Sequence, residues 1–290
     1  MSLIDPKKTI EVIQSRDFTF KKSFGQNFLI DYHVLDKIID AADIGEEDYV
    51  LEIGPGIGTL TEALAARARK VIAVEIDDKL IPILTENLSG FDNIEIVHND
   101  ILKVDIDELI KSSCEGHPVK VVANLPYYIT TPIIMELLER RVPMISATVM
   151  VQKEVADRMK AGPGTKDYGA LSLAVQYYAA VSQEAFVPPN CFIPRPKVGS
   201  AVVKLAIHDE PPVKARDEKL LFDVIRGAFE QRRKTLVNAL ANYAKLDFTK
   251  PEVAQALDAA ELSEQIRGEA LTLSQFAVLA DDLAAVRDNR

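Results

Sequence analysis

Residues 124–127 read Asn-Leu-Pro-Tyr, a combination of groups that could act on an aromatic amine. The side-chain oxygen of Asn124 and the backbone carbonyl of Leu125 can each accept one N–H bond from such an amine. Two such bonds would draw adenine N6 towards tetrahedral geometry and free its lone pair for attack. Pro126 restricts the chain around this carbonyl, and Tyr127 offers a ring on which an extruded base can stack. The pattern predicts group transfer by positioning and electrostatics, without a strong general base.

A glycine-rich turn is the second group of residues with chemical potential. Gly54, Gly56 and Gly58 close one apolar run and open a helical one, so a nucleoside cofactor can approach the backbone there. Glu75 and Asp100 follow the next two apolar runs, where one carboxylate can accept from ribose hydroxyls and the other from an adenine amine. The spacing G-x-G-x-G differs from the dinucleotide pattern G-x-G-x-x-G, which weakens NAD as the cofactor. The plain structural alternatives are a glycine turn with surface acids and a strand-ending turn with core aromatics.

Alternating strand-like and helix-like runs would position these residues. The alternation implies βαβ units and a mostly parallel sheet, whose strands carry ligands at their carboxyl ends. The expected fold is therefore a Rossmann-like α/β domain with a seven-stranded, mostly parallel sheet. The expected strands are 49–53, 70–76, 94–98, 120–124 and 147–152, with two more within 181–208. The expected helices are 33–42, 59–68, 78–88, 131–140 and 153–159.

The spacing of apolar residues becomes helical throughout 219–290, after a polar stretch with a proline pair that is typical of a linker. Thr249 is expected to cap the third helix of this tail, with Pro251 tolerated in its first turn. We therefore predict a Rossmann-like α/β domain at residues 1–209, which includes an N-terminal segment, and a small all-helical domain at 210–290.

Composition sets the broad class of the protein. The 290 residues are 48% hydrophobic and 27% charged, which is enough for a packed core. No run approaches the roughly 18 apolar residues of a membrane span, and the first residues lack a secretory signal, so we expect a cytoplasmic protein with no membrane partner. Cys114 and Cys191 are the only cysteines and are expected to be free thiols.

The net charge of −10 argues against a nucleic-acid partner when it is taken alone. Basic stripes within 1–30, 186–204 and 226–245 nevertheless leave places where RNA can dock. Any one of these stripes can also be an ordinary solvated surface.

Eight motifs, in order, resemble the ribosomal RNA adenine dimethyltransferase family, and more narrowly its branch that acts on bacterial small-subunit (16S) rRNA. The resemblance covers nearly the whole chain. The motifs are KKSFGQNFLID (21–31), VLEIGPGIGTLT (50–61), AVEID (73–77), VHNDIL (97–102), NLPYYI (124–129), VQKEVADRM (151–159), CFIPRPKVGSAVV (191–203) and FEQRRKTL (229–236).

The resemblance implies an S-adenosylmethionine-dependent enzyme that dimethylates N6 of two adjacent adenosines in a hairpin loop near the 3′ end of 16S rRNA. It would act on the small (30S) subunit, contribute to its biogenesis, and work as a monomer without a metal. Loop bases are partly unstacked, so extruding one costs less than extruding it from a duplex.

The resemblance also assigns residues. Cofactor contacts are expected at Gln26, Asn27, Leu29, Gly54, Gly56, Glu75, Ile76, Asp100, Ile101 and Asn124. The target amine is expected at Asn124, Leu125, Pro126 and Tyr127, with a second stacking face on Phe192. RNA contacts are expected at Arg195, Lys197, Arg232, Arg233 and Lys234.

Three alternatives remain open. The first is a resistance-type relative that methylates one adenine of large-subunit rRNA, and the acidic balance disfavours it because such enzymes act on exposed RNA. The second is a non-catalytic RNA-binding or assembly factor, although an intact glycine turn, Glu75, Asp100 and the 124–127 motif argue against a purely binding role. The third is a nicotinamide oxidoreductase.

Overall fold

A computed structural model describes residues 3, 9–11 and 26–290 of the chain. The chain folds as two compact units, Met1–Ala156 with Ala180–Ile207 and Asp157–Ala179 with His208–Arg290. The prediction placed one division after residue 209. The chain passes from one unit to the other after Ala156, Ala179 and Ile207. Residues Asp157–Ala179, which lie within the predicted first domain, therefore belong to the second unit.

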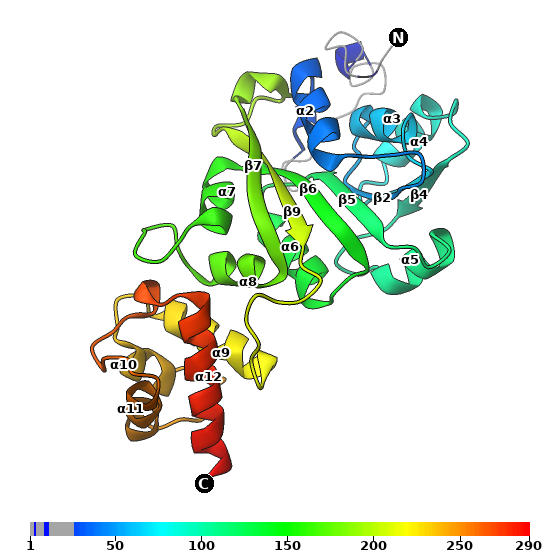
Figure 1. Ribbon diagram of the computed structural model, residues 1–290. Coiled ribbons are helices and arrows are strands. Elements are labelled where there is room, and N and C mark those ends of the chain that lie inside the picture. The colour runs from blue at the N-terminus through cyan, green and yellow to red at the C-terminus, as the bar shows by residue number, and fades with distance from the viewer. Residues whose placement is uncertain (1–2, 4–8, 12–25) are drawn as a thin grey trace. The chain divides into compact units, whose positions relative to one another are not determined.

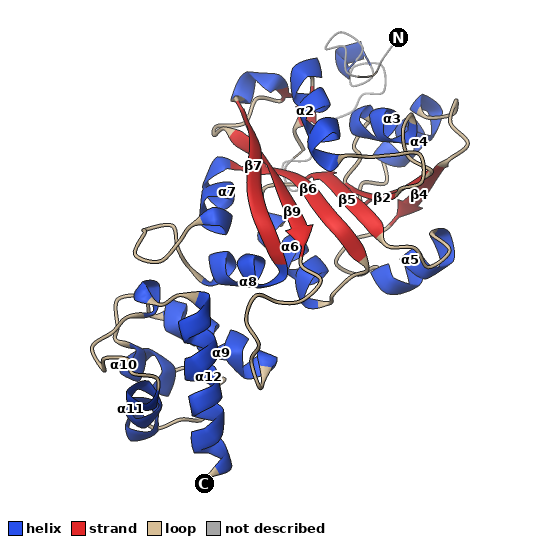
Figure 2. Ribbon diagram, viewed as in Figure 1, coloured by secondary structure: helices blue, strands red, loops and turns tan. Residues whose placement is uncertain are grey.

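The first unit is built on a seven-stranded sheet in the order β4-β3-β2-β5-β6-β9-β7 (Figures 1 and 2). Five strands are parallel to their neighbours from β4 to β6, while β9 is antiparallel to β6, which confirms the predicted mostly parallel sheet. The strands are β2 (Tyr49–Ile53), β3 (Lys70–Glu75), β4 (Ile94–His98), β5 (Val119–Asn124), β6 (Met144–Gln152), β7 (Ala179–Val187) and β9 (Ser200–Ile207).

The central strands are apolar because both faces of the sheet are covered. Every residue of β2 is buried, as expected for a parallel strand with helices on both sides. Helix α2 (Tyr32–Ala42) starts at Asp31, whose side chain accepts from the Val34 N–H at 3.1 Å. Its apolar face joins Val122 and other strand residues in one core cluster. Apolar packing on both faces therefore holds this part of the sheet in place.

The other helices of the first unit match the predicted positions within a few residues, with one exception. They are α3 (Thr59–Ala65), α4 (Leu80–Asn87), α6 (Thr130–Glu139) and α7 (Lys153–Lys160), and α7 runs past Ala156 into the second unit. Helix α5 (Ile106–Ser113) was not predicted, because it has only eight residues and three of them are apolar, Ile106, Leu109 and Ile110.

The second unit is all helical. Its members are α8 (Ala170–Tyr178), α9 (Glu218–Glu230), α10 (Leu236–Ala241), α11 (Lys250–Ala259) and α12 (Leu273–Asp288). Thr249 caps α11 as predicted, because its backbone N–H donates to Glu252 at 2.7 Å and its hydroxyl accepts from the Glu252 N–H at 3.4 Å. Helix α8 was not predicted, because its sequence is apolar almost throughout and lacks a polar face.

Aromatic side chains explain why Asp157–Ala179 belongs to the second unit. The Tyr168 hydroxyl donates to the Leu271 carbonyl at 2.7 Å, and the Tyr168 ring meets the Phe229 ring edge-on at 5.8 Å. The hydroxyls of Tyr177 and Tyr178 each lie 3.0 Å from a Glu218 carboxylate oxygen. These contacts join Asp157–Ala179 to α9 and to the residues before α12. Local composition cannot predict them, because the partners are far apart in the sequence.

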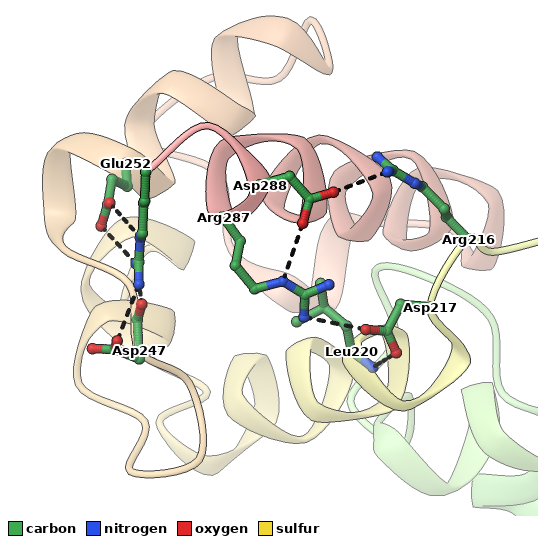
Figure 3. Close-up of polar contacts among 8 residues, drawn as sticks. Arg216, Asp217, Leu220, Asp247, Glu252, Arg287 and Asp288 are labelled. Carbon is green, nitrogen blue, oxygen red and sulfur yellow. Dashed lines mark hydrogen bonds and ion pairs between the residues drawn. The ribbon is translucent and has the colours of Figure 1, made fainter.

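Exposed ion pairs surround the end of α12 (Figure 3). Arg287 pairs with Asp217 at 3.2 Å, and Asp217 also caps α9 by accepting from the Leu220 N–H at 3.0 Å. Arg216 pairs with Asp288 at 2.9 Å. The Leu220 hydrogen bond and Arg287 together lower the pKa of Asp217 below its ordinary value.

Three properties of the described residues bear on the class of protein. No helix in these ranges is both long enough and apolar enough to cross a bilayer. The same ranges contain no group of three or more His, Cys, Asp or Glu side chains that could hold a metal ion. Cys114 and Cys191 are buried free thiols, as predicted, and burial raises the pKa of each to about 11.

Candidate functional site

One open pocket of about 1030 Å³ lies at the edge where the parallel strands end. Its walls come from the residues around β1 (Phe28–Leu29), the glycine turn after β2, the ends of β3 and β4, and the segment after β5. The structure brings thirteen predicted residues together here: Gln26, Asn27, Leu29, Gly54, Gly56, Glu75, Ile76, Asp100, Ile101, Asn124, Leu125, Pro126 and Tyr127. Segments up to 101 positions apart in sequence therefore share one cavity.

The glycine turn is tied directly to Glu75. The Gly56 backbone has a φ of 62° and its N–H donates to Glu75 at 3.1 Å, while the second carboxylate oxygen accepts from the Asp77 N–H at 2.9 Å. A side chain at position 56 would also strike the Phe28 ring, at 2.8 Å from the added Cβ. Burial raises the pKa of Glu75, and the backbone donors oppose that rise. Each carboxylate oxygen has two lone pairs, so capacity remains for hydroxyl donors in the pocket.

Asp100 organises the turn after β4. One of its oxygens accepts from the Leu102 N–H at 3.1 Å, and its own N–H donates to the Asn99 side chain at 2.8 Å. Its other oxygen lies 3.8 Å from Lys103, which is largely exposed. The carboxylate is thereby fixed at the pocket wall, where it can accept a further hydrogen bond.

The amide of Asn124 is oriented by the backbone of Asn27. The Asn124 Nδ2 donates to the Asn27 carbonyl at 2.9 Å. A carbonyl can only accept, so the NH₂ end of the amide must face Asn27 and the side-chain oxygen must face elsewhere. Gln26 holds the same segment in place by donating to Asp77 at 2.7 Å. The Asn124 side-chain oxygen, which the sequence analysis expects to accept from the target amine, is therefore oriented by the residues around β1.

Tyr127 is held at its hydroxyl end. The hydroxyl lies 2.6 Å from the hydroxyl of Ser200, the first residue of β9, and Ser200 is fully buried. Burial raises the pKa of Tyr127 and the Ser200 bond opposes this. The ring is half-buried at the pocket, whereas the next residue, Tyr128, is mostly exposed. Ser200 was not predicted, because 72 residues separate it from Tyr127 and nothing local marks it.

Phe192 does not contribute to this pocket. It forms β8 (Phe192–Ile193), which pairs antiparallel with β1, so that Phe192 lies opposite Leu29. Its side chain is 2% exposed and packs in the same core cluster as α2. In this structure the Phe192 ring fastens β1 to the core, and the second stacking face on Phe192 stays a prediction.

The five predicted RNA contacts differ in their surroundings. Arg232 donates to Glu269 at 2.9 Å and to the carbonyls of Lys166 and Thr165, so its guanidinium serves the internal structure of the second unit. The RNA contact at Arg232 stays a prediction, with the side chain 37% exposed. Arg195 and Lys197 are exposed in the first unit, and Arg233 and Lys234 are exposed in the second.

Two further pocket residues escaped the sequence analysis. Phe28 covers the Gly56 backbone, and Glu52 precedes the glycine turn with 1% exposure. Burial raises the pKa of Glu52 to about 8, and the negative charge of Glu75 adds to the rise. One Glu52 oxygen has no hydrogen-bond partner among the described residues. The sequence did not single out Glu52, because there it is one polar residue in an apolar run. Only the structure shows that its side chain is buried beside the glycine turn.

The parallel sheet, the glycine turn tied to an acid, and the second acid at the next strand end define an S-adenosylmethionine-dependent methyltransferase. Residues 17–278 match the family model described as ribosomal RNA adenine dimethylase, and the chain belongs to this family.

Relatives agree over nearly full length. The chain is 60% identical over 278 residues, 96% of each chain, to a Ribosomal RNA small subunit methyltransferase A of Lachnoclostridium phytofermentans. A crystal structure of a dimethyladenosine transferase from Plasmodium falciparum matches 87% of this chain and 95% of its own, with 29% identity and a TM-score of 0.72. The 23S rRNA methyltransferase ErmE matches 89% and 100%, with 29% identity and a TM-score of 0.66.

Proposed function

We propose that the enzyme transfers methyl groups to N6 of two adjacent adenosines in a hairpin loop near the 3′ end of 16S rRNA, within the small ribosomal subunit. The observation that carries this proposal is the Asn124 amide, whose NH₂ end is held by the Asn27 carbonyl beside the residues of the glycine turn. The names of the full-length relatives support small-subunit RNA over large-subunit RNA as the substrate.

The donor set of the pocket fits S-adenosylmethionine. Glu75 would hold ribose hydroxyls, Asp100 the adenine amine, and the backbone around Gly54 the methionine end, with Ile76 and Ile101 against the adenine ring. Gln26, Asn27, Leu29 and Gly56 complete this set at the pocket wall. When bound, the cofactor supplies an electrophilic methyl group on a sulfonium.

The residues of the 124–127 motif would act on the target amine. The Asn124 side-chain oxygen and the Leu125 carbonyl accept its two N–H groups, which localises the nitrogen lone pair. Tyr127 stacks on the base, with its hydroxyl fixed by Ser200. As the nitrogen gains a methyl it becomes a strong acid and releases a proton to water, so the residues need only position the amine.

Detection of the product tests the proposal. Wild-type protein and Asn124→Ala would be incubated with methyl-labelled cofactor and unmethylated 30S subunits, and the RNA would be digested. We expect N6,N6-dimethyladenosine from the wild type and its loss in the variant. Label in large-subunit RNA alone would support a resistance-type enzyme. Binding without label would support an assembly factor.

We also infer that residues 210–290 form an rRNA-binding domain, that the enzyme acts as a monomer, and that it works in the cytoplasm, where small subunits are assembled. Exposed Arg233 and Lys234 in the second unit support an RNA-facing role. Sedimentation of the free enzyme and of its complex with 30S subunits tests both the monomer and the partner.

A further inference from the structure

Phe186 is an aromatic residue that the proposed reaction leaves without a role. It lies on β7, the edge strand of the sheet next to β9 (Figure 1). Its side chain is 52% exposed, which is unusual for a phenylalanine in a folded protein. Val198, in the loop before β9, is also among the exposed large hydrophobic residues.

The Phe186 ring is seated on a glycine. A Cβ added to Gly199 would lie 2.6 and 2.7 Å from two atoms of this ring, far inside van der Waals contact. Only a residue without a side chain lets the ring rest against the backbone here. The Gly199 carbonyl in turn accepts from the Lys153 N–H at 3.0 Å, so the seat itself is fixed. The exposed ring is therefore held in one place.

The seat adjoins the residue that anchors Tyr127. Gly199 contacts Phe186, and the next residue, Ser200, bonds the Tyr127 hydroxyl at 2.6 Å. Consecutive Cα atoms lie about 3.8 Å apart, so a single peptide unit links the supports of the two aromatic rings. Ser200 is opposite Gln152 at the carboxyl end of β6, which places this linkage at the edge of the sheet that carries the pocket.

The chain segment that follows Phe186 is basic. Residues 186–204 contain Arg195, Lys197 and Lys204 and no acid, within a chain of net charge −10. Arg195 and Lys197 are exposed in the same loop as Val198, four and two residues before Gly199, respectively. Exposed rings beside cations suit single-stranded nucleic acid, because bases stack on the ring while phosphates meet the charges.

We infer that Phe186, seated on Gly199, is a stacking platform for an unpaired nucleotide that flanks the target adenosine, with Arg195 and Lys197 contacting its phosphates. This inference rests on the proposed function and adds a second base-binding position to it. Tyr127 would hold the reacting base inside the pocket, and Phe186 a neighbouring base outside it.

The first test compares Phe186→Ala with Ile145→Ala in the full-length enzyme. Ile145 is a matched control because it is 49% exposed but lies near the opposite, amino end of β6. We expect Phe186→Ala to raise the KM for 30S subunits by about 5- to 100-fold, the range for loss of one base–aromatic stack. The kcat and the cofactor Kd should change less than twofold, and Ile145→Ala should match the wild type. A KM unchanged in Phe186→Ala overturns the inference.

Salt dependence tests the cations. The slope of log affinity against log salt should fall by about 0.7 for each phosphate contact removed from a single strand, in Arg195→Gln and Lys197→Gln. A slope equal to that of the wild type in both variants contradicts the phosphate contacts.

Two further measurements separate this inference from the proposed function. Gly199→Ala should displace the ring and raise the KM in the same direction as Phe186→Ala. A photoreactive phenylalanine analogue at position 186 should crosslink to rRNA, and crosslinking only to a ribosomal protein overturns the nucleotide platform. Failure of the wild type to form dimethyladenosine would reject the proposed function, whereas an active wild type with unaffected Phe186→Ala would reject only the platform.

Discussion

The pocket of the first unit and the end of α12 in the second unit use charge in opposite ways. In the pocket, Glu75 is buried and its two oxygens accept from the backbone N–H groups of Gly56 and Asp77. Around α12, Arg216 and Arg287 pair with carboxylates that water also reaches (Figure 3). A buried carboxylate that accepts from backbone N–H groups fixes the backbone around it. Exposed ion pairs are screened by water and salt and contribute little to stability. Substitutions should therefore have large effects in the first region and small effects in the second.

The largest effect is expected at Asn124. In Asn124→Asp the side chain keeps oxygen acceptors but cannot donate to the Asn27 carbonyl, so its orientation is lost. We expect the single-turnover rate to fall by about 10²- to 10³-fold, as for loss of one oriented polar group at a reacting centre. Asn99→Asp is the control, because Asn99 uses its oxygen to accept from the Asp100 N–H. Equal rates in the two variants would contradict the orienting role of Asn27.

The next effect is on stability and depends on pH. The pKa of Glu52 rises from 4.5 to about 8 on folding, so between these values the folded protein holds a proton that the unfolded chain has released. The free energy of unfolding should therefore fall as pH rises through this window, by up to about 1.4 kcal/mol per pH unit from this group. Denaturant unfolding at pH 5 to 8 should show a smaller fall in Glu52→Gln than in the wild type.

Glu95 provides the control for that experiment. Burial acts to raise its pKa, but hydrogen bonds from Lys70 and Ser113 lower it below the ordinary value. Its stabilising charge is thus present above the ordinary carboxyl pKa and is lost only at lower pH. Glu95→Gln should leave the slope between pH 5 and 8 unchanged. Parallel curves for the wild type and Glu52→Gln would argue that Glu52 is ionised in the folded protein.

A smaller effect is expected at Ser200. Removing its hydroxyl in Ser200→Ala frees the Tyr127 ring, at a cost of about 1 kcal/mol for one hydrogen bond. We expect turnover to fall by about fivefold, and Tyr127→Phe to cause a similar loss. The double variant should be no worse than either single one, because both remove the same bond. Additive losses, or an equal loss in the buried-serine control Ser146→Ala, would show that the bond is not what orients the ring.

The smallest effect is expected at the end of α12. Arg287→Ala removes exposed pairs with Asp217 and Asp288, and we expect a loss of less than about 1 kcal/mol, which high salt should reduce further. Thermal unfolding at low and high salt measures it. A loss above about 2 kcal/mol would erase the contrast between the two regions.

Where a strong periodicity or a motif exists, the sequence predicted the positions of the strands along the chain and the residues that line the pocket. The strands β2 and β4 have the predicted bounds, and every predicted cofactor residue lines the one pocket described above. Helix α8 was missed because it is apolar almost throughout and has no amphipathic period. Helix α5 was missed because it has only eight residues, too few for the helical spacing of Ile106, Leu109 and Ile110 to stand out.

Other features that the sequence did not reveal depend on contacts between distant segments. Phe192 is a core residue because β8 pairs with β1, and Arg232 is engaged by Glu269, 37 positions away. Ser200 and the seat of Phe186 are likewise products of strand pairing at the sheet edge. Local spacing carries none of these relations, because partners across a sheet or between helices are chosen by the whole fold.

The atom that orients Asn124 belongs to the main chain, and this has a consequence for how the site tolerates genetic change. Every amino acid at position 27 supplies the same carbonyl oxygen, so a conventional alanine scan is blind to this contact. The oxygen is positioned by the ladder between β1 and β8 and by the Ile30 N–H, which donates to the Cys191 carbonyl at 2.9 Å. A substitution at position 27 would therefore change the side chain at the pocket wall and leave this backbone acceptor in place. Weakening it requires atomic editing, such as replacing the Asn27–Phe28 peptide bond with an ester by protein semisynthesis.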